Sequence, residues 1–495
     1  MNGLKRIFIG TAILTLAACG GGGGGGSAPP PNTGGGGGAG GGGGNTGGIG
    51  RTGLAVGPVS NFGSVVVNGV RYDTSQAVFT LDGAAGIESD LDIGDIVLVR
   101  GSIDEDGING VADEVFYDEA VKGPIDSIDI ANDRIVVLGQ TVLINAETSF
   151  DDDFIPANIE GLTVGVFVEV SGLPNSTGEI IASRIEPESD TNEFEVTGFV
   201  ANLDTAAQTF EINALTVDYA TAMLEDFPNG EIGEGDLVEV EGSQRDANGV
   251  LIAEEVDFES VLPDLTGTDD VDLEISGLIT RFASSTDFDV AGIPVTTNGD
   301  TDFENGTIND LALDVRVEVE GELSSEGVLV ADDIEFRPEA SIEIEAQIDS
   351  IDTGAGSFVV LGITVNTDAS TKFEDFSSAS LTRLTIENLS VGDYIEVAAV
   401  PQEGVNTVLA RTVERDDDEE GEVVLEGTVT EIAEPSFTIL GVTVTTDANT
   451  EFEFDDMTLT SAQFFDSLTV GDQVEVEGIE SSDTVIAAET VELDD

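Results

Sequence analysis

The sequence predicts an all-β protein in which six tandem small β-barrels follow a disordered, glycine-rich tether. Three observations lead to this expectation: segments in which apolar and acidic residues alternate, polar turns between those segments, and an internal repeat of 70 to 79 residues. Alternation with a period of two is typical of a strand with one buried face. A repeat of this length corresponds to a whole domain, since the coils of a β-solenoid recur about every 20–30 residues.

The first repeated element is a strand with the pattern Val-x-Val-x-Gly. It recurs at Val97–Gly101, Val168–Gly172, Val238–Gly242, Val317–Gly321, Ile395–Ala399 and Val474–Gly478. A Gly-Asp turn precedes it in four copies, as at Gly94-Asp95. The valines are expected to point inward. The residues expected to point outward into solvent are Glu169, Glu239, Glu318, Glu396 and Glu475.

The second repeated element follows the first by 10 or 11 residues and reads Ala-x-x-Val or Ala-x-x-Ile, as at Ala112 and Val115. Polar, often glycine-containing residues separate the two elements. Strand, turn and strand together predict a β-hairpin.

The third repeated element lies upstream and consists of two short strands about a glycine. It is clearest at Phe358–Val365 and Phe437–Val444. Eleven residues after that glycine come the expected core residues Phe150, Phe303, Phe373 and Phe452. A short helix is expected at 461–465. The order of about five or six short strands favours a small closed barrel similar to an OB-fold, with a small sandwich as the alternative.

These elements set the expected domain boundaries. The repeats are expected at 51–121, 122–190, 191–262, 263–340, 341–415 and 416–495. The junctions among the first five repeats are short and are expected to be stiff. The run Asp416–Glu420 is expected to separate the last two repeats as a self-repelling linker. A linear array of such domains would reach on the order of 150–180 Å.

The N-terminal sequence predicts export from the cytoplasm and attachment to a membrane. Lys5 and Arg6 precede a mostly apolar stretch, 7–16, which is too short for a stable membrane span and typical of a signal peptide over 1–18. The chain's single cysteine, Cys19, ends the sequence Leu-Ala-Ala-Cys, which resembles the lipobox of bacterial lipoproteins. The resemblance implies lipid attachment at Cys19. Because residue 20 is glycine, it also implies the outer membrane.

Residues 19–50 are expected to form the tether. This segment carries 20 of the 61 glycines together with three consecutive prolines, so it should behave as a flexible coil. The repeats themselves resemble tandem domains of unknown function found in secreted bacterial lipoproteins. That resemblance implies a cell-envelope β-repeat protein and supplies no catalytic residues.

Composition excludes several kinds of function. The 495 residues carry 16 Lys and Arg against 99 Asp and Glu, a net charge of −83, which argues against nucleic acid and against anionic lipid surfaces. There is no His, which removes catalytic triads and His metal ligands, and one Cys permits no intrachain disulfide. The absence of Trp and the presence of only four Tyr argue against aromatic sugar-binding platforms.

Calcium is the cofactor class that an acidic chain most readily suggests. The best local string, 102–107 with Asp113 in EF-hand register, is interpreted as a hairpin turn because it lies between two strands. Three further acidic runs, interpreted as solvated surface, are 151–153, 269–270 and 332–333. No metal ligand, cofactor or catalytic residue is therefore assigned.

The expected function is that of a non-enzymatic, lipid-anchored envelope protein, acting as a spacer, scaffold or binding array. The alternative is a Ca²⁺-responsive, adhesin-like array in which the ion bridges neighbouring domains. A carbohydrate-active enzyme, which would need two carboxylates across a cleft, is the third possibility.

Overall fold

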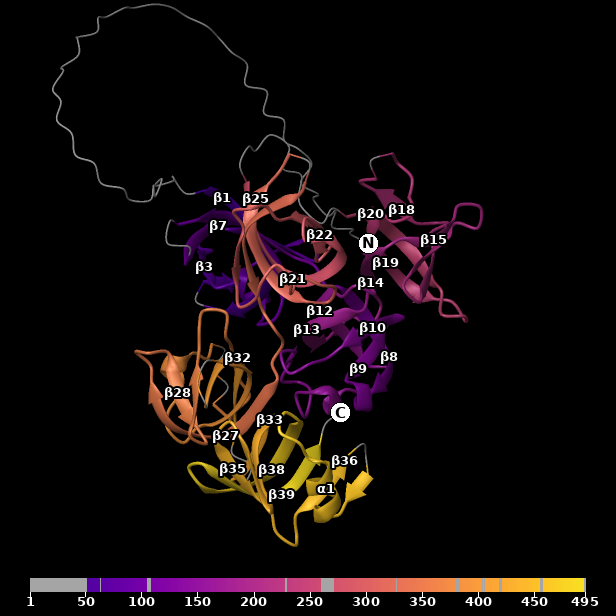
Figure 1. The fold of residues 1–495 in the computed structure, drawn as a ribbon. Coiled ribbons are helices and arrows are strands. Elements are labelled where there is room, and N and C mark those ends of the chain that lie inside the picture. The colour runs from indigo at the N-terminus through magenta and orange to yellow at the C-terminus, as the bar shows by residue number, and fades with distance from the viewer. Residues whose placement is uncertain are drawn as a thin grey trace, which may run out of the picture.

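The computed structural model describes residues 51–493 apart from 63, 105–107, 228, 260–270, 326, 380, 382, 403, 405, 418–420 and 455–456. The signal segment, Cys19 and the glycine-rich segment lie outside the described residues. The described part is almost entirely β-structure (Figure 1). None of its helices is long and apolar enough to cross a membrane.

The strands form three sheets of 13 strands, and each sheet joins two strand sets, which we call units. The first sheet contains units 1 and 4. Unit 1 consists of β1 (Arg51–Asn61), β2 (Val65–Val67), β3 (Val70–Asp73), β4 (Val78–Leu81), β5 (Ala84–Gly86), β6 (Ile96–Ile103) and β7 (Asn109–Tyr117). Unit 4 consists of β21 (Val271–Ser284), β22 (Asp287–Val290), β23 (Ile293–Thr296), β24 (Asp302–Glu304), β25 (Arg316–Leu323) and β26 (Leu329–Phe336).

The second sheet contains units 2 and 3. Unit 2 consists of β8 (Val121–Asp129), β9 (Arg134–Val137), β10 (Gln140–Leu143), β11 (Ser149–Phe150), β12 (Phe167–Pro174) and β13 (Ile180–Pro187). Unit 3 consists of β14 (Phe194–Phe199), β15 (Ala201–Asp204), β16 (Thr209–Ile212), β17 (Leu215–Asp218), β18 (Met223–Glu225), β19 (Leu237–Arg245) and β20 (Leu251–Phe258).

The third sheet contains units 5 and 6. Unit 5 consists of β27 (Ile342–Asp352), β28 (Ser357–Val360), β29 (Ile363–Asn366), β30 (Lys372–Asp375), β31 (Tyr394–Pro401) and β32 (Thr407–Asp416). Unit 6 consists of β33 (Glu422–Ala433), β34 (Ser436–Ile439), β35 (Val442–Thr445), β36 (Glu451–Phe454), β37 (Met457–Leu459), α1 (Ser461–Ser467), β38 (Gln473–Ser482) and β39 (Val485–Leu493).

Helical turns precede the long hairpin in some units. The predicted short helix is confirmed as α1, whose first turn is capped by Thr460. Four short 3-10 turns accompany the strands: Glu88–Asp90, Ile130–Asn132, Ile159–Gly161 and Ile386–Asn388.

Each unit closes into a small barrel, as unit 2 illustrates. Its strands follow the order β8-β9-β10-β13-β12 and return to β8, with β10 and β13 parallel and the other neighbours antiparallel. The short strand β11 adds to β13 alongside β10. Closure satisfies most backbone hydrogen bonds within the barrel and leaves only short edge segments, such as residues 121–122 of β8, free to pair with another unit.

The repeated glycine of the first element lies where two strands approach closely. A Cβ at Gly101 would lie 2.1 Å from the carbonyl oxygen of Val111, and one at Gly321 would lie 2.1 Å from that of Val330. The register of the hairpin shifts at this point in each unit, which is a β-bulge. Gly101 faces Ala112 across the bulge, so the two sequence elements mark one close crossing of β6 and β7.

The buried face of each barrel agrees with the sequence pattern. All the valines and isoleucines of the Val-x-Val positions are buried, and so are Phe150, Phe373 and Phe452. Phe303 is only partly buried against its core. The apolar residues of units 5 and 6 form a single continuous cluster across their joint sheet, and those of units 2 and 3 do the same.

The expectation of a linear array is wrong. Unit 1 pairs with unit 4 through parallel β1 and β21, which are separated by two other units along the chain. Units 2 and 3 pair through β8 and β14, and units 5 and 6 pair through β27 and β33. Figure 1 shows units 1 and 4 together at the top, unit 2 below them, and units 5 and 6 at the bottom.

The expected acidic linker does not hold units 5 and 6 apart. Asp416 ends β32, and Asp417 accepts hydrogen bonds from Ser378, while 418–420 lie outside the described residues. The pairing of β27 with β33 joins the two units despite the charge of this run, because backbone hydrogen bonds and a shared apolar core outweigh a screened surface repulsion.

The prediction that the outward glutamates are solvated is wrong for four of the five. Only Glu396 among them is exposed, whereas Glu169, Glu239, Glu318 and Glu475 are half-buried. The pairing of units places these positions in rows that run across a joint sheet. In one such row the facing residues, in order, are Glu186, Glu169, Lys122, Glu195, Glu241 and Glu255.

Candidate functional site

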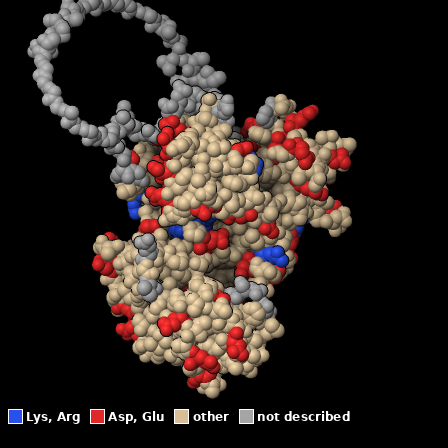
Figure 2. Space-filling view, viewed as in Figure 1, with Lys and Arg blue, Asp and Glu red and all other residues tan. Residues whose placement is uncertain are grey.

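Several of the chain's few basic residues lie where units meet, although others, such as Arg134 and Arg281, pair with acids of their own unit. The two lysines of residues 51–495 are Lys122 and Lys372, and both are buried at junctions. Arg184 of unit 2 ion-pairs with Asp92 of unit 1 and lies 3.9 Å from Glu374 of unit 5. In Figure 2 acidic side chains are spread over the visible surface, whereas basic ones are few. Scarce positive charge is therefore used between units.

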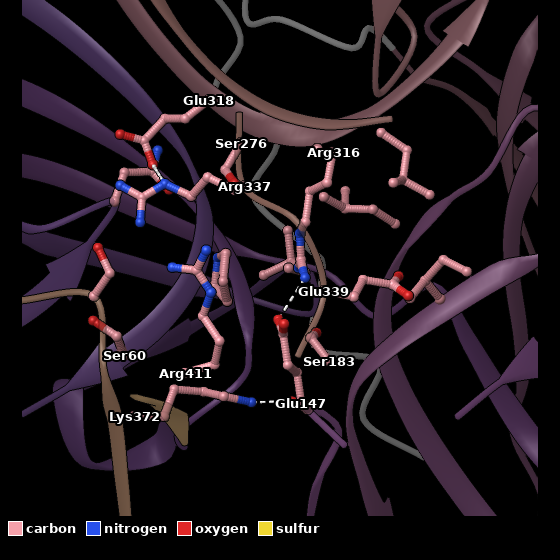
Figure 3. A pocket seen from close by; sticks show the side chains of 18 of the residues that line it. Ser60, Glu147, Ser183, Ser276, Arg316, Glu318, Arg337, Glu339, Lys372 and Arg411 are labelled. Carbon is pink, nitrogen blue, oxygen red and sulfur yellow. Dashed lines mark hydrogen bonds and ion pairs between the residues drawn. The ribbon is translucent and has the colours of Figure 1, made fainter. Parts of the chain in front are cut away.

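A cavity of about 90 Å³ lies where units 1, 2, 4 and 5 meet. Four basic side chains line it, Arg316, Arg337, Lys372 and Arg411, and Figure 3 shows them approaching from different sides. Its polar lining also includes Ser60, Asn68, Asn145, Ser183, Ser276 and Ser370, and its acidic lining consists of Glu147, Glu318 and Glu339. We call this cavity the junction pocket.

Glu147 of unit 2 holds one wall of the junction pocket together. Its backbone N–H donates to the side chain of Asn145 in the turn before β11. One carboxylate oxygen accepts from Arg316 of unit 4 at 2.6 Å, and the other accepts from the backbone N–H of Ala340 at 3.0 Å. Lys372 of unit 5 donates to the Glu147 carbonyl oxygen. The pKa of Glu147 is lowered. Burial alone would raise it, but the positive charges of Arg316, Lys372 and Arg411 outweigh that effect.

On the opposite wall, Arg337 follows β26 and pairs with the carboxylates of Glu318 and Glu335 at 3.0 and 2.9 Å. Burial raises the pKa of Glu318 to about 7, although Arg337 opposes the shift. The guanidinium of Arg337 is thus ion-paired with carboxylates of its own unit.

Arg411, on β32, is the guanidinium that remains available in the junction pocket. It donates a long hydrogen bond, 3.4 Å, to the carbonyl oxygen of Pro338, and no carboxylate among the described residues lies within 4.0 Å of it. Burial and the charges of Arg337 and Arg316 lower its pKa, whereas the more distant charges of Glu147 and Asp368 act in the opposite direction. The hydroxyl of Ser183, also in the lining, is buried without a hydrogen-bond partner in the described chain.

This arrangement suits a small anion. A guanidinium presents paired donors that match a carboxylate or phosphate, and such bonds are stronger away from bulk water. A cavity of about 90 Å³ has room for several water molecules or for a small anionic group.

Glu147 and Glu318 are not available to each other as a hydrolytic pair. Both oxygens of Glu147 are engaged, and Glu318 is ion-paired with Arg337. A general acid and a general base would each need an accessible carboxyl group facing the substrate.

The comparison with protein families bears on every unit except the first. A family model described as "Domain of unknown function (DUF5666)" matches residues 122–186, 197–257, 276–335, 345–414 and 426–492, which is more than half of the chain. The chain belongs to the DUF5666 family. Five tandem DUF5666 domains therefore form small barrels in this protein.

The other comparisons add little to the DUF5666 assignment. No curated protein matches the sequence. A similar solved structure, titled "drosophila Unr CSD456", shares 17% sequence identity and covers 45% of this chain and 98% of its own, with a TM-score of 0.12. At that TM-score the likeness supports no statement about function.

Where the structure describes them, the acidic runs named from sequence do not join one another in a group of metal-ligating carboxylates. Residues 102–104 lead from β6 into the turn before β7, and the backbone N–H of Asp104 donates to Asn109, as expected for a hairpin. Asp151, Asp152 and Asp153 lie close to one another at the surface, and Asp151 pairs with Arg184. Asp332 and Asp333 lie on β26, and residues 269–270 lie outside the described chain, as does Cys19.

All four tyrosines, Tyr72, Tyr117, Tyr219 and Tyr394, are buried and offer no exposed platform. The residues of the junction pocket were missed from sequence, because they come from four units that no local pattern brings together. One feature of the sequence could have indicated them. The chain has very few basic residues, and four of these line the junction pocket.

Proposed function

We propose that this DUF5666 protein is a non-enzymatic, lipid-anchored cell-envelope protein that binds a small anionic ligand in the junction pocket. The observation that carries the proposal is Arg411, a partly buried guanidinium with no carboxylate partner in the described chain. The ligand class is a carboxylate- or phosphate-bearing small molecule. The surrounding barrels act as the scaffold that forms the pocket.

We further propose that unit 1 is a sixth, diverged copy of the same domain and that the barrels are OB-like. The strands of unit 1 close in the order β1-β2-β3-β7-β6, with β3 and β7 parallel, which is the pattern of unit 2. A five-stranded closed barrel of this kind is the architecture of an OB-fold. The fold does not fix the ligand, and the net charge of −83 argues against nucleic acid.

Lipid attachment at Cys19 and an outer-membrane location remain part of the proposal because of the Leu-Ala-Ala-Cys sequence. Tethering by 31 following residues would hold the barrels off the membrane surface. A Cys19→Ser chain that still fractionates with membranes would remove this part.

Replacing Arg411 is expected to weaken anion binding at least tenfold, because a hydrogen bond to a charged group contributes about 1.5–3 kcal/mol. Isothermal titration calorimetry with inorganic phosphate and with glucuronate, at fixed ionic strength, would compare the parent chain with Arg411→Gln. The two probes distinguish phosphate from carboxylate ligands.

The matched control is Arg134→Gln, which removes an exposed arginine ion-paired with Asp129. It should bind the anions as the parent does. Equal binding by Arg411→Gln and the parent, or no binding of either anion by the parent, would contradict the proposal.

A further inference from the structure

A second group of charged residues lies where unit 1 contacts the joint sheet of units 2 and 3. Asp82 occupies the turn between β4 and β5, Glu119 precedes β8, and Glu195 lies on β14. One carboxylate oxygen from each lies within 4.8 Å of the others. The three residues come from parts of the chain that only the packed structure brings together.

Two of these carboxylates, those of Glu119 and Glu195, are buried, and Asp82 is half-buried. Glu119 and Glu195 are 1% and 0% exposed. Both oxygens of each, and one oxygen of Asp82, have no hydrogen-bond partner in the described chain. Removing an ionised carboxylate from water without a partner is very unfavourable, so buried acids are normally paired, protonated or bound to a metal.

The positive charge nearby is insufficient. Lys122 lies 3.4 Å from Asp82 and 3.5 Å from Glu119. It is shared with Glu188 and Glu193 at 3.6 and 3.7 Å. All four distances exceed the roughly 2.7–2.9 Å of a strong ionic hydrogen bond. One ammonium therefore faces four carboxylates and holds none of them closely.

Glu195 also belongs to a second group. One of its oxygens lies within 4.8 Å of carboxylate oxygens of Glu239 and Glu241 on β19. Glu195 faces Glu241 directly across the pair of strands, and like charges in that position are unfavourable. The burial of Glu195 between two acidic groups is the feature that a bound cation would relieve.

The chemistry of the donors selects the kind of cation. All the available ligands are carboxylate oxygens, which hard cations prefer, and the part of the chain that the structure covers supplies no His or Cys here. Three carboxylates can offer up to six oxygens, within the range of about six to eight that Ca²⁺ takes. Mg²⁺ usually retains several waters, and a group in which two of the three carboxylates are buried leaves little room for them.

We propose that Asp82, Glu119 and Glu195 form a Ca²⁺-binding site that fixes unit 1 to the joint sheet of units 2 and 3. Glu239 and Glu241 flank the ion from β19, and Lys122 remains paired with Glu188 and Glu193. The site is independent of the junction pocket, which is lined by none of these residues.

Titration of the full chain with CaCl₂ by calorimetry, at constant ionic strength, tests the site. The parent is expected to show one binding step that is tighter than any weak binding to surface acids, and MgCl₂ should bind less tightly. Glu195→Gln and Glu119→Gln should each weaken that step at least tenfold. Melting curves without Ca²⁺ establish that each variant is folded.

Asp152→Asn is the matched control, because it removes one charge from an exposed acidic group. It should leave the tight step unchanged, and Ca²⁺ should raise the melting temperature of this control as it does that of the parent. The proposal is overturned if the parent gives no tight step. It is also overturned if both Glu variants, shown to be folded, bind Ca²⁺ as the parent does.

Discussion

Raising the pH from about 5 to about 8 is expected to destabilise the pair formed by units 5 and 6. A row of acids crosses their joint sheet, in which Glu343 of β27 faces Glu426 of β33 and Glu426 faces Glu475 of β38. Burial raises the pKa of Glu343 to about 8, and the neighbouring charges of Glu396 and Glu345 add to the effect. Glu426 and Glu475 act in the same direction from unit 6.

The direction of this pH effect follows from the pKa of Glu343 in the unfolded and in the folded chain. In the unfolded chain Glu343 loses its proton near its ordinary pKa of 4.5, whereas in the folded chain it keeps the proton to about pH 8. The folded state therefore binds more protons between these values, and stability falls as the pH rises. After allowance for partial solvent screening, the contribution is about 3 kcal/mol.

Thermal melts of the parent at several pH values would measure this, with a melting temperature several degrees lower at pH 8 than at pH 5. Glu343→Gln is neutral at both pH values and should flatten the dependence, chiefly by raising the melting temperature at pH 8. Glu387→Gln, at an exposed position of the same unit, is the control. Stability that rises with pH over this range would contradict the role of the row.

Removing the Glu147 carboxylate is expected to have a similarly large effect on the junction of units 2, 4 and 5. Glu147→Ala leaves the guanidinium of Arg316 without its partner and leaves Lys372, which is 7% exposed, in a more positive environment. Breaking one side of a fully buried ion pair typically costs about 3–5 kcal/mol, and because the side chains of Arg316 and Glu147 are 21% and 14% exposed, about 2–3 kcal/mol is expected here. Burial already lowers the pKa of Lys372, so it has little tolerance for a lost anion.

Denaturant unfolding would compare Glu147→Ala with Glu160→Ala, which removes an exposed glutamate from the same unit. Glu147→Gln separates loss of charge from loss of shape, because it retains an oxygen able to accept from Ala340. A loss below about 1 kcal/mol for Glu147→Ala would show that this ion pair does not hold the junction together.

The strands and hairpins could be predicted because the barrels repeat a local pattern. The hairpin turn at Leu138 and Gly139 has two residues with positive φ, of 49° and 74°, and Gly at the second position accepts this readily. The turn before the long hairpin likewise needs a positive φ, of 96° at Gly94. At the matching place in unit 4 Asp314 adopts 61°, so the motif survives there without its glycine.

The pairing of units could not be predicted in the same way. The first strands of the units are β1, β8, β14, β21, β27 and β33, and nothing in their sequences indicates that β1 pairs with β21 rather than with β8. The sequence pattern alone therefore predicts that the outward glutamates face solvent, whereas the pairing of units places them in shared rows. Both candidate sites lie at unit junctions and depend on this pairing.

The scarcity of basic residues was the one compositional feature that pointed to the junctions. Lys122 lies beside the acidic group at unit 1, and Lys372 lines the junction pocket. The net charge of −83 therefore does not identify a partner. Part of it comes from acidic residues that lie in rows across the joint sheets.

The claim that non-neighbouring units pack into one body is tested most directly by small-angle X-ray scattering of residues 51–495. We expect a compact scattering profile with a radius of gyration of about 22 Å, which is the value for a folded chain of this length. A rod-like profile with a maximum dimension on the order of 150 Å would contradict the pairing of β1 with β21 and both sites that depend on the packed units.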